Sequence, residues 1–307
     1  MPELPEVEHL RQTLRPLLIG RQVARATLHR RDVAVGPHDP PGGFARQRTR
    51  VRPSRLGRQQ LLEGERLSGV DRRGKFLAIV AQSGRALGVH LGMSGQVLWA
   101  ARGRRLPTDH VHATWRLDDG SRLVFRDPRR FGGLWLADSR DRLAPWGTLG
   151  PDALDIDPEV IVGLLERVRR PIKAALLDQR LLAGVGNIYA DESLHRAGIH
   201  PRTLACDLTP SEARLLGRSI CAVLGAAVSA GGSTLRDYRS ASGEPGGFQL
   251  DHRVYGRGGQ PCLACGRVLE QALVAQRTTV WCTGCQPTHT RKPHRPQSHN
   301  LSTTSCG

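Results

Sequence analysis

Residues 112–125, His-Ala-Thr-Trp-Arg-Leu-Asp-Asp-Gly-Ser-Arg-Leu-Val-Phe, show the architecture of the first half of this chain most clearly. Apolar side chains alternate within His112–Leu117 and again within Leu123–Phe125, and Asp119-Gly120 separates the two runs. Alternation with period two indicates half-buried strands, and an Asp-Gly step between two such runs is typical of a tight turn. This stretch therefore predicts an antiparallel hairpin.

Similar short strands are expected on both sides of this hairpin, from about residue 20 to residue 136. One runs from Lys75 to Val80 and ends before a Ser83-Gly84 turn. Several strands joined by Gly and Pro turns predict an antiparallel sandwich or barrel. Before them, apolar residues between Leu4 and Leu18 recur at helical spacing, which predicts an N-terminal helix. We expect residues 1–136 to form one β-sandwich domain with this helix.

The pattern changes after Pro145, and residues 158–230 are expected to be helical. Thr209-Pro210-Ser211-Glu212 combines an N-cap, a proline at the first helical position and a capping-box glutamate. Leu215, Leu216, Ile220, Val223, Leu224 and Ala227 supply the buried stripe of the helix that follows, which Gly231-Gly232 ends. The chain is thus predicted to be a multidomain α+β protein, with a helical domain at 152–232.

The last part of the chain combines a loop, a cysteine unit and a tail. A Gly/Ser/Pro-rich stretch up to about Gly247 predicts a mobile loop, and residues 233–286 include this loop and four cysteines. Residues 287–307 contain His, Ser, Thr and Arg but no acidic residue, which predicts a disordered basic tail.

The overall charge suggests a polyanionic partner. The 307 residues include 45 Lys and Arg against 28 Asp and Glu, a net charge of +17 with a sequence pI near 11.0. Nucleic acid is the commonest polyanion that such a surface binds. No apolar run of 18 residues and no signal-peptide core is present, so we expect a soluble, unsecreted protein without a membrane partner.

Four of the seven cysteines have the spacing of metal ligands. Cys262-x2-Cys265 and Cys282-x2-Cys285 are separated by 16 residues, which fits a zinc ribbon around one structural Zn²⁺. Four thiolates close the coordination shell of the metal and leave no catalytic position on it. A redox pair or chance spacing are the alternatives. The remaining cysteines are Cys206, Cys221 and Cys306.

The sequence begins Met1-Pro2-Glu3-Leu4-Pro5-Glu6, which allows two interpretations. Removal of Met1 would leave Pro2 as a free secondary amine, and an α-amino group titrates near ~7.7–8, so a useful fraction is neutral at pH 7. Such an amine is a nucleophile able to attack a sugar carbon and form an iminium. The alternative is that the two prolines only shape the start of the helix.

Two further stretches combine glycine with side chains suited to nucleic acid. His90–Gly95 places Met93 between glycines, where it could be a wedge between bases instead of the core filler that methionine usually is. Asp127–Gly132 interleaves two arginines with Phe131, which suits phosphate contact together with stacking.

Three more residues are singled out by their place in the sequence. Asn187 lies at the start of a predicted helix, where it is either a plain N-cap or part of a phosphate site. Lys75 and Lys173 are two of only three lysines in an Arg-rich chain, so each could be needed for its compact ammonium group. Arg277 lies between the two cysteine pairs, where a hairpin could present it to a phosphate or a base.

Together these motifs resemble a known family. These motifs are Pro2–Glu8, Arg73–Phe76, the Met93 loop, the Arg129–Phe131 loop, the segment Gly184–Ala190 around Asn187 and the cysteine quartet, in this order along the chain. From Met1 to about Gln286 the chain resembles the formamidopyrimidine-DNA glycosylases, bacterial base-excision enzymes that remove oxidised purines.

The resemblance implies catalytic roles for four residues. Pro2 would form the Schiff base at C1′ of the damaged nucleotide, and Glu3 would act as acid and base in opening the deoxyribose. Lys75 matches a proton-donating lysine. Arg277 matches an arginine of the zinc hairpin that binds phosphate beside the lesion.

The resemblance also implies a set of DNA contacts. Met93, Arg129 and Phe131 would fill the gap left when the damaged base leaves the stack. Residues 232–248 match a mobile loop that closes over the flipped base, although Gly246-Gly247-Phe248 departs from the usual pattern there. Residues 152–232 would form a helix–two-turn–helix domain. The remaining expected DNA and phosphate contacts are His110, Arg169, Lys173 and Asn187.

The expected function is that of a bifunctional DNA glycosylase and abasic-site lyase ending in β,δ-elimination. Its partner would be duplex DNA with oxidised bases or abasic sites, bound by a cytoplasmic monomer. One alternative is an endonuclease VIII-like enzyme for oxidised pyrimidines. Another is a non-enzymatic zinc-ribbon protein that binds damaged DNA without cutting it.

Overall fold

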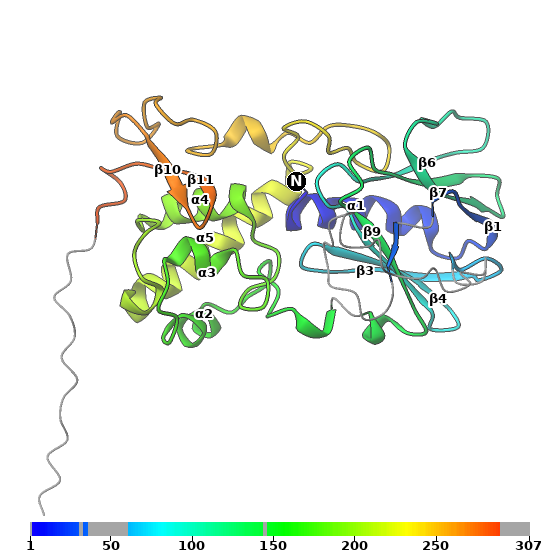
Figure 1. Ribbon diagram of the computed structural model, residues 1–307, viewed down its shortest axis with the longest axis horizontal. Helices are drawn as coiled ribbons and strands as arrows, with labels where there is room; N and C mark the ends of the chain where they lie inside the picture. The colour runs from blue at the N-terminus through cyan, green and yellow to red at the C-terminus, as the bar shows by residue number, and fades with distance from the viewer. Residues whose placement is uncertain (1, 31–32, 36–60, 144–145, 289–307) are drawn as a thin grey trace, which may run out of the picture.

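The computed structural model describes residues 2–30, 33–35, 61–143 and 146–288. It has two lobes, one built on β-strands and one on helices, with the N-terminus at the junction between them (Figure 1). The predicted disordered tail lies outside the described residues from position 289 onward. We call the two parts the sandwich lobe and the helical lobe.

The sandwich lobe consists of two sheets. The first has the order β1-β7-β8-β6 and the second β2-β9-β5-β4-β3. All strand pairs are antiparallel except β2 with β9. The first sheet contains β1 (Val23–Leu28), β6 (Gln96–Ala100), β7 (Val111–Leu117) and β8 (Arg122–Arg126). The second contains β2 (Ala34–Val35), β3 (Leu67–Arg73), β4 (Phe76–Ala81), β5 (Ala86–His90) and β9 (Gly133–Ala137).

The predicted hairpin is confirmed as β7–β8. Trp115 is paired with Leu123, and the turn lies at Asp118–Ser121. The buried side chains of this hairpin, Ala113, Trp115 and Phe125 among them, face the shared core of the lobe. The antiparallel sandwich expected from the alternation is therefore present.

Helix α1 (Leu4–Leu18) joins the two lobes. Glu3 is its N-cap and forms a reciprocal capping box with Glu6. Leu10, Leu14 and Leu18 are fully buried in the core of the sandwich lobe, whereas Leu4 belongs to the core of the helical lobe. The first turn of α1 is thereby fixed between the lobes.

The helical lobe contains α2 (Pro158–Leu165), α3 (Ile172–Leu176), α4 (Asn187–Ala197) and α5 (Pro210–Ser229). The capping box of Thr209 and Glu212 is formed as predicted, and α5 ends just before Gly231-Gly232. The predicted buried stripe on α5 is confirmed at five positions. The prediction is wrong at Leu215, which is 42% exposed. Short 3₁₀ helices lie at Arg140–Arg142, Trp146–Thr148, Ala205–Asp207 and Phe248–Asp251.

The C-terminal part returns across the molecule. Residues that follow α5 run back over the junction toward the sandwich lobe, and the chain then reaches the hairpin of β10 (Glu270–Val274) and β11 (Arg277–Trp281), which lies against α4 (Figure 1). Segments from both halves of the chain therefore meet at the junction.

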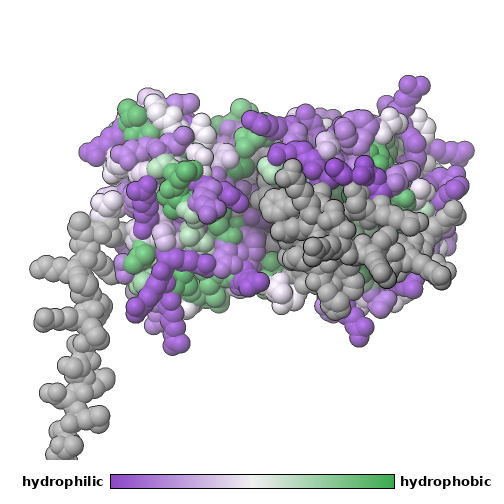
Figure 2. Space-filling view, viewed as in Figure 1, coloured by the Kyte–Doolittle hydropathy of each residue, from purple (hydrophilic) through white to green (hydrophobic). Residues whose placement is uncertain are grey.

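The face of the protein in Figure 2 is mostly hydrophilic where it is not grey, with small hydrophobic groups on the helical lobe.

Candidate active site and nucleic-acid interface

Pro2 and Glu3 are buried at the junction of the lobes. Oε1 of Glu3 accepts a hydrogen bond of 3.1 Å from the backbone N–H of Ile188, in the first turn of α4. Within the described residues, Oε2 of the same carboxylate has no hydrogen-bond partner. A carboxylate is favoured at a helix N-terminus, so one oxygen is anchored and the other is available for chemistry beside Pro2.

Glycine is required where Glu3 meets α4. A Cβ added at Gly186 would lie 2.2 Å from Cδ of Glu3, and one added at Gly184 would lie 2.2 Å from Leu4. Gly184 and Gly186 therefore allow the N-terminal segment to approach the start of α4 closely.

Glu6 lies beneath Glu3 in a buried polar cluster. It accepts hydrogen bonds from the backbone N–H groups of Glu3 and Ser233, each at 2.7 Å, and from the hydroxyl of Tyr189. Burial, and then the charge of Glu3, raise the pKa of Glu6, although these hydrogen bonds oppose the shift. Glu6 thus ties the start of α1 to α4 and to the loop after α5.

Lys75 lies in the turn between β3 and β4 and is 8% exposed. Burial lowers the pKa of its ammonium group, while the carboxylates of Glu3 and Glu6 act in the opposite direction and Arg277 lowers it further. Lys75, Glu3 and Arg277 are therefore close enough to influence one another. The structure brings these three sequence-predicted residues to one place, although they come from α1, the β3–β4 turn and the second hairpin.

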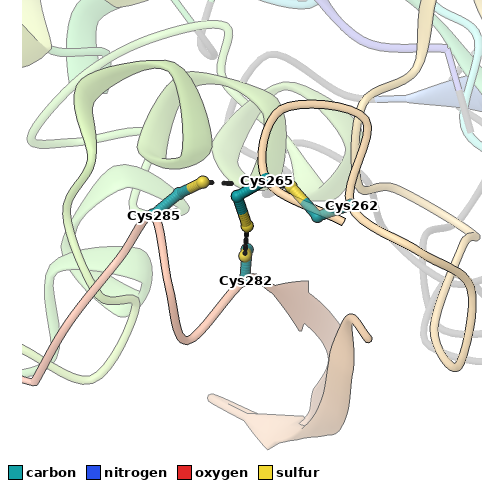
Figure 3. Close-up of side chains that lie close together, drawn as sticks. All are labelled: Cys262, Cys265, Cys282 and Cys285. Atoms are coloured by element: carbon teal, nitrogen blue, oxygen red, sulfur yellow. Dashed lines mark hydrogen bonds between the residues drawn. The ribbon is translucent and has the colours of Figure 1, made fainter. Parts of the chain in front are cut away.

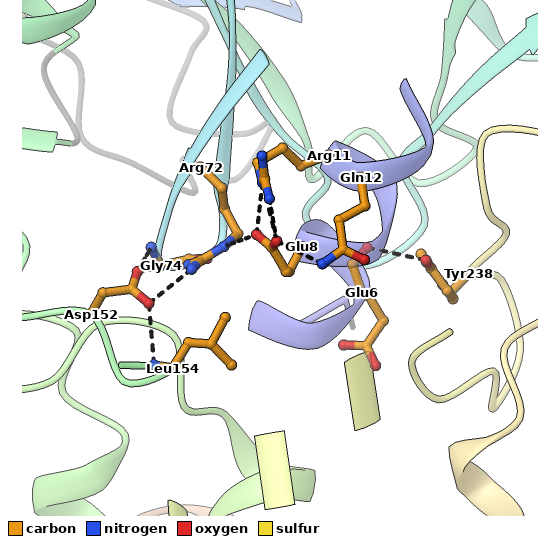
Figure 4. A network of polar contacts seen from close by, with 9 residues as sticks. All are labelled: Glu6, Glu8, Arg11, Gln12, Arg72, Gly74, Asp152, Leu154 and Tyr238. Atoms are coloured by element: carbon orange, nitrogen blue, oxygen red, sulfur yellow. Dashed lines mark hydrogen bonds and ion pairs between the residues drawn. The ribbon is translucent and has the colours of Figure 1, made fainter. Parts of the chain in front are cut away.

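Sequence reasoning missed the network that holds the Lys75 turn. Arg72 donates to both oxygens of Asp152 at 2.6 and 2.9 Å and to Glu8 at 2.8 Å, and Asp152 also accepts the backbone N–H of Gly74 (Figure 4). Burial alone would raise the pKa of Glu8, but hydrogen bonds from Arg11 and Arg72 bring it below its usual value. The network joins α1, the β3–β4 turn and the start of the helical lobe.

The Met93 loop and the Arg129–Phe131 loop lie against each other. Asp127 is fully buried and accepts hydrogen bonds from the hydroxyl of Ser94 at 2.6 Å and the N–H of Gly132 at 2.7 Å. A Cβ at Gly92 would lie 2.3 Å from the carbonyl carbon of Phe131. Buried hydrogen bonds and a glycine contact thus fix the relative position of the two loops.

The side chains that these loops present are accessible. Met93 is 36% exposed, unlike a core methionine. The guanidinium carbon of Arg129 lies 5.0 Å from the centre of the Phe131 ring, a cation–π arrangement. The structure therefore places the three predicted gap-filling side chains on two adjoining loops.

His110 and Arg169 are both exposed. His110 has a left-handed backbone with φ of 56°, and its Nε2 lies 4.0 Å from Asp109. Arg169 precedes α3 on the other lobe. Both positions are open to a ligand, as a DNA contact requires.

The structure corrects the sequence-based picture of Asn187. The N-cap of α4 is Gly186, so Asn187 is its first helical residue. The amide of Asn187 donates to the carbonyl of Thr278 at 3.0 Å, and its oxygen is buried without a hydrogen-bond partner among the described residues. Asn187 therefore connects α4 to the β10–β11 hairpin.

Lys173 also differs from the expectation of a phosphate contact. Its side chain is completely buried, and its ammonium group donates to Asp191 at 2.6 Å, to Thr279 Oγ1 at 2.7 Å and to the carbonyl of Thr278 at 3.2 Å. A direct phosphate contact does not fit this conformation, because all three protons are used. Lys173 instead joins α3, α4 and the hairpin that carries Arg277.

The β10–β11 hairpin presents Arg277 directly after its turn. The turn residues Ala275 and Gln276 both have a left-handed backbone, with φ of 51° and 57°. Such a two-residue turn fits the twist of a hairpin but is normally formed by Asn-Gly, so non-glycine residues here are strained. Arg277 is exposed at this tip.

The four cysteines form the predicted cluster. Their sulfur atoms all lie within 4.8 Å of one another, two from the turn at residues 262–265 and two from the turn at 282–285 (Figure 3). Sγ of Cys265 lies 3.3 Å from Cys282, and Sγ of Cys262 lies 3.9 Å from Cys285. Four thiolates at these separations are suited to hold one metal ion.

In the described part of the chain, no helix is long and apolar enough to cross a membrane.

Comparisons with known proteins define the class. The sequence profile of the formamidopyrimidine-DNA glycosylase N-terminal domain matches residues 1–134, and that of the H2TH domain of the same proteins matches residues 149–239. The chain therefore belongs to the formamidopyrimidine-DNA glycosylase family.

Individual relatives agree with this assignment. Formamidopyrimidine-DNA glycosylase of Thermus thermophilus is 46% identical over 295 residues, covering 93% of this chain and 98% of the relative. The crystal structure of the T. thermophilus protein matches with a TM-score of 0.76 and the same coverage. Lactococcus lactis structures with DNA containing Fapy-dG or an abasic site match at 32% and 31% identity, each with a TM-score of 0.78 and covering 94% of this chain and all of the other.

Proposed function

We propose that this protein is a bifunctional DNA glycosylase and abasic-site lyase of base-excision repair, acting in the cytoplasm as a monomer on oxidised purines in duplex DNA. The observation that carries the proposal is the place of Glu3, which directly follows the buried Pro2 and lies, like Arg277, close enough to Lys75 to influence the pKa of its ammonium group. These residues supply an amine, a carboxylate and two cations, which are the groups needed to replace a base by an imine on a sugar.

In the proposed reaction, the amine of Pro2 attacks C1′ of the damaged nucleotide while the bond from C1′ to the base breaks. Opening of the sugar ring gives a Schiff base, and Glu3 transfers the proton that ring opening requires. Loss of a proton from C2′ then expels the 3′ phosphate, and a second elimination expels the 5′ phosphate. Hydrolysis of the imine returns Pro2 to its free form.

Lys75 and Arg277 would assist at two different groups of the nucleotide, the leaving base and a phosphate. The lowered pKa of Lys75 makes its ammonium a better proton donor than an exposed lysine, so we assign to it the proton delivered to the leaving base. Arg277 is suited to hold a phosphate beside the lesion, because a planar guanidinium group can pair with two phosphate oxygens.

The DNA would lie across the junction. Met93, Arg129 and Phe131 would occupy the gap left by the extruded base, and His110 and Arg169 would contact the backbone from the two lobes. Asn187 and Lys173 would act through the hairpin, by positioning Arg277. The loop at 232–248 would close over the flipped base.

We propose that the cysteine cluster holds Zn²⁺, because four thiolates around one centre favour this ion and leave no open position. The metal would keep the short β10–β11 hairpin folded and would take no part in the chemistry.

The decisive experiment is borohydride trapping on duplex DNA that contains 8-oxoguanine. Wild-type protein should give a covalent adduct that peptide mass mapping places on Pro2, and the control variant Pro5→Gly should give the same adduct. Intact-mass measurement tests the required loss of Met1. An adduct mapped to an internal lysine instead of the N-terminal residue would disprove the assignment of the nucleophile.

Oxidised pyrimidines are a second candidate substrate class. A Lactococcus lactis structure that matches this chain with 31% identity and a TM-score of 0.77 contains DNA with an oxidised pyrimidine. A panel of lesion duplexes under single-turnover conditions would rank the two classes. A protein that bound every duplex but cut none would instead fit the non-enzymatic alternative.

A further inference from the structure

A cavity outside the cluster of Pro2, Glu3 and Lys75 lies at the edge of the sandwich lobe. It has a volume of about 770 Å³ and is bounded by β6, by residues 101–109 and by residues 236–243 of the loop after α5. Strand β6 is an edge strand of its sheet. The cavity therefore forms where the loop covers this edge.

Arginine dominates the charge of this cavity. Its lining includes Arg104, Arg105, Arg126, Arg236 and Arg239, against two acidic residues, Asp109 and Asp237. Arg126 is paired with Asp109. Within the described residues, no salt bridge is formed by Arg104, Arg105 or Arg236, all of which are exposed.

The loop side of the cavity is attached to the sheet by polar contacts. The N–H of Trp99 donates to the carbonyl of Ala241 at 2.8 Å, and the amide of Gln96 donates to the carbonyl of Asp237. Arg126 donates to Gln96 at 3.3 Å. The arginines contributed by the sheet side and by the loop side are thus held around one space.

Two residues that line the cavity are sequence neighbours of residues at the proposed DNA interface. Asp109, which lines it, precedes the exposed His110, and Arg126 lies one residue before the buried Asp127 that fixes the Arg129 loop. A DNA strand in contact with His110 would therefore lie beside a residue that lines the cavity. Guanidinium groups are well suited to the paired oxygens of a phosphate.

We propose that this cavity binds a phosphodiester of the DNA backbone flanking the lesion, with Arg104 and Arg105 on the sheet side and Arg236 on the loop side. A phosphate held between them would also hold the loop against β6. The proposal rests on the proposed function, because it extends the same DNA interface, but Arg104 and Arg105 take no part in base removal.

The test compares the salt dependence of duplex binding in two double variants. Arg104→Ala/Arg105→Ala removes the sheet side of the cavity. Arg25→Ala/Arg116→Ala is the matched control, because these exposed arginines lie opposite each other on β1 and β7, away from the cavity. Each lost phosphate contact lowers the slope of log K against log salt by about 0.9.

We expect the magnitude of the slope to fall by about 0.9 in the cavity variant relative to wild type, because one phosphate contact is lost, and to stay unchanged in the control. Arg236→Ala removes the loop side of the same phosphate site and should lower the slope by no more than about 0.9. Single-turnover base excision at saturating enzyme should be unchanged in the cavity variant. Thermal unfolding of each variant confirms that it is folded.

Two results would overturn the proposal. One is an unchanged slope in Arg104→Ala/Arg105→Ala, which is also the outcome if the cavity takes only small free anions. The other is an equal loss in the control, which would mean a diffuse effect of charge. Failure of the proposed function is distinguishable, because a wild type that binds duplex DNA without excision leaves the comparison of slopes intact.

Discussion

The carboxylate of Glu3 is held by the backbone N–H of Ile188, 185 residues further along the chain. Together with the hydrogen bond from Tyr189 to Glu6, this contact fixes the N-terminal segment against the first turn of α4, and it depends on the absence of a side chain at Gly186.

Gly186→Ala should therefore impair chemistry. Its Cβ would lie 2.2 Å from Cδ of Glu3, so the carboxylate must move, and displacement of about 1 Å at a reacting group can cost roughly 100-fold in rate. Single-turnover base excision measures this. Gly163→Ala is the control, because it meets nothing within 4 Å in α2 and should be neutral or stabilise by up to about 1 kcal/mol. Equal rates in the two variants would contradict the role of this contact.

Lys75→Met should abolish excision yet stabilise the fold. The pKa of Lys75 is lower in the folded protein than its ordinary value of 10.5, so the unfolded chain binds more protons and stability rises with pH between the two values. The cost of burying the ammonium is fully present below the folded pKa and decreases above it. Urea unfolding at increasing pH should show a higher free energy of unfolding for the variant than for wild type, with a difference that narrows as the pH rises through the folded pKa toward 10.5. A gap that widens with pH would be the opposite of this linkage.

Lys173→Met should damage stability and, when it is added to Arg277→Ala, leave the salt slope of DNA binding unchanged. Burial raises the pKa of Asp191 to about 6 despite Lys173, and removing the lysine leaves this carboxylate unpaired, at a cost of about 3–5 kcal/mol. Adding Asp191→Asn should restore part of the loss. Arg169→Ala is the counterpart, since an exposed phosphate contact should cost less than about 0.5 kcal/mol in stability and lower the slope by about 0.9. A further fall in slope when Lys173→Met is added to Arg277→Ala would instead indicate a direct phosphate contact of Lys173.

Removal of the metal should impair Schiff-base formation by unfolding the hairpin that carries Arg277. A chelator, or Cys282→Ser, should unfold the β10–β11 hairpin and withdraw Arg277, while the core of the sandwich lobe remains folded. Trapping yield should fall and return when zinc is added back to the chelated protein. Cys206→Ser lies outside the cluster and should behave as wild type. Full activity after verified metal loss would exclude a supporting role for the cluster.

Local signals in the sequence predicted most of the fold. The alternation around Asp119-Gly120 indicated β7–β8, the capping box at Thr209 indicated the start of α5, and the cysteine spacing indicated the cluster. Each depends on residues close together in sequence, where period, caps and ligand spacing are sufficient.

The parts that the sequence did not reveal depend on long-range contacts. The Arg72–Asp152 pair joins residues 80 positions apart, and nothing in an Arg-rich sequence marks one arginine as buried. Lys173 was noticed as a rare lysine, but its burial follows from how α3, α4 and the second hairpin pack together. The interpretation of Asn187 as an N-cap is wrong by one position. Gly186 is the N-cap of α4, although it has no side chain that could accept a hydrogen bond there.

The burial of the N-terminal segment among later parts of the chain also orders events during synthesis. Glu3 and Glu6 are made at the start, yet Ile188 and Ser233, which donate hydrogen bonds to them, must leave the ribosome before their surroundings are complete. On the proposed mechanism, an aminopeptidase has its easiest access to Met1 before those segments arrive. The nascent chain would thus expose its N-terminus for processing and complete the proposed site only when nearly finished.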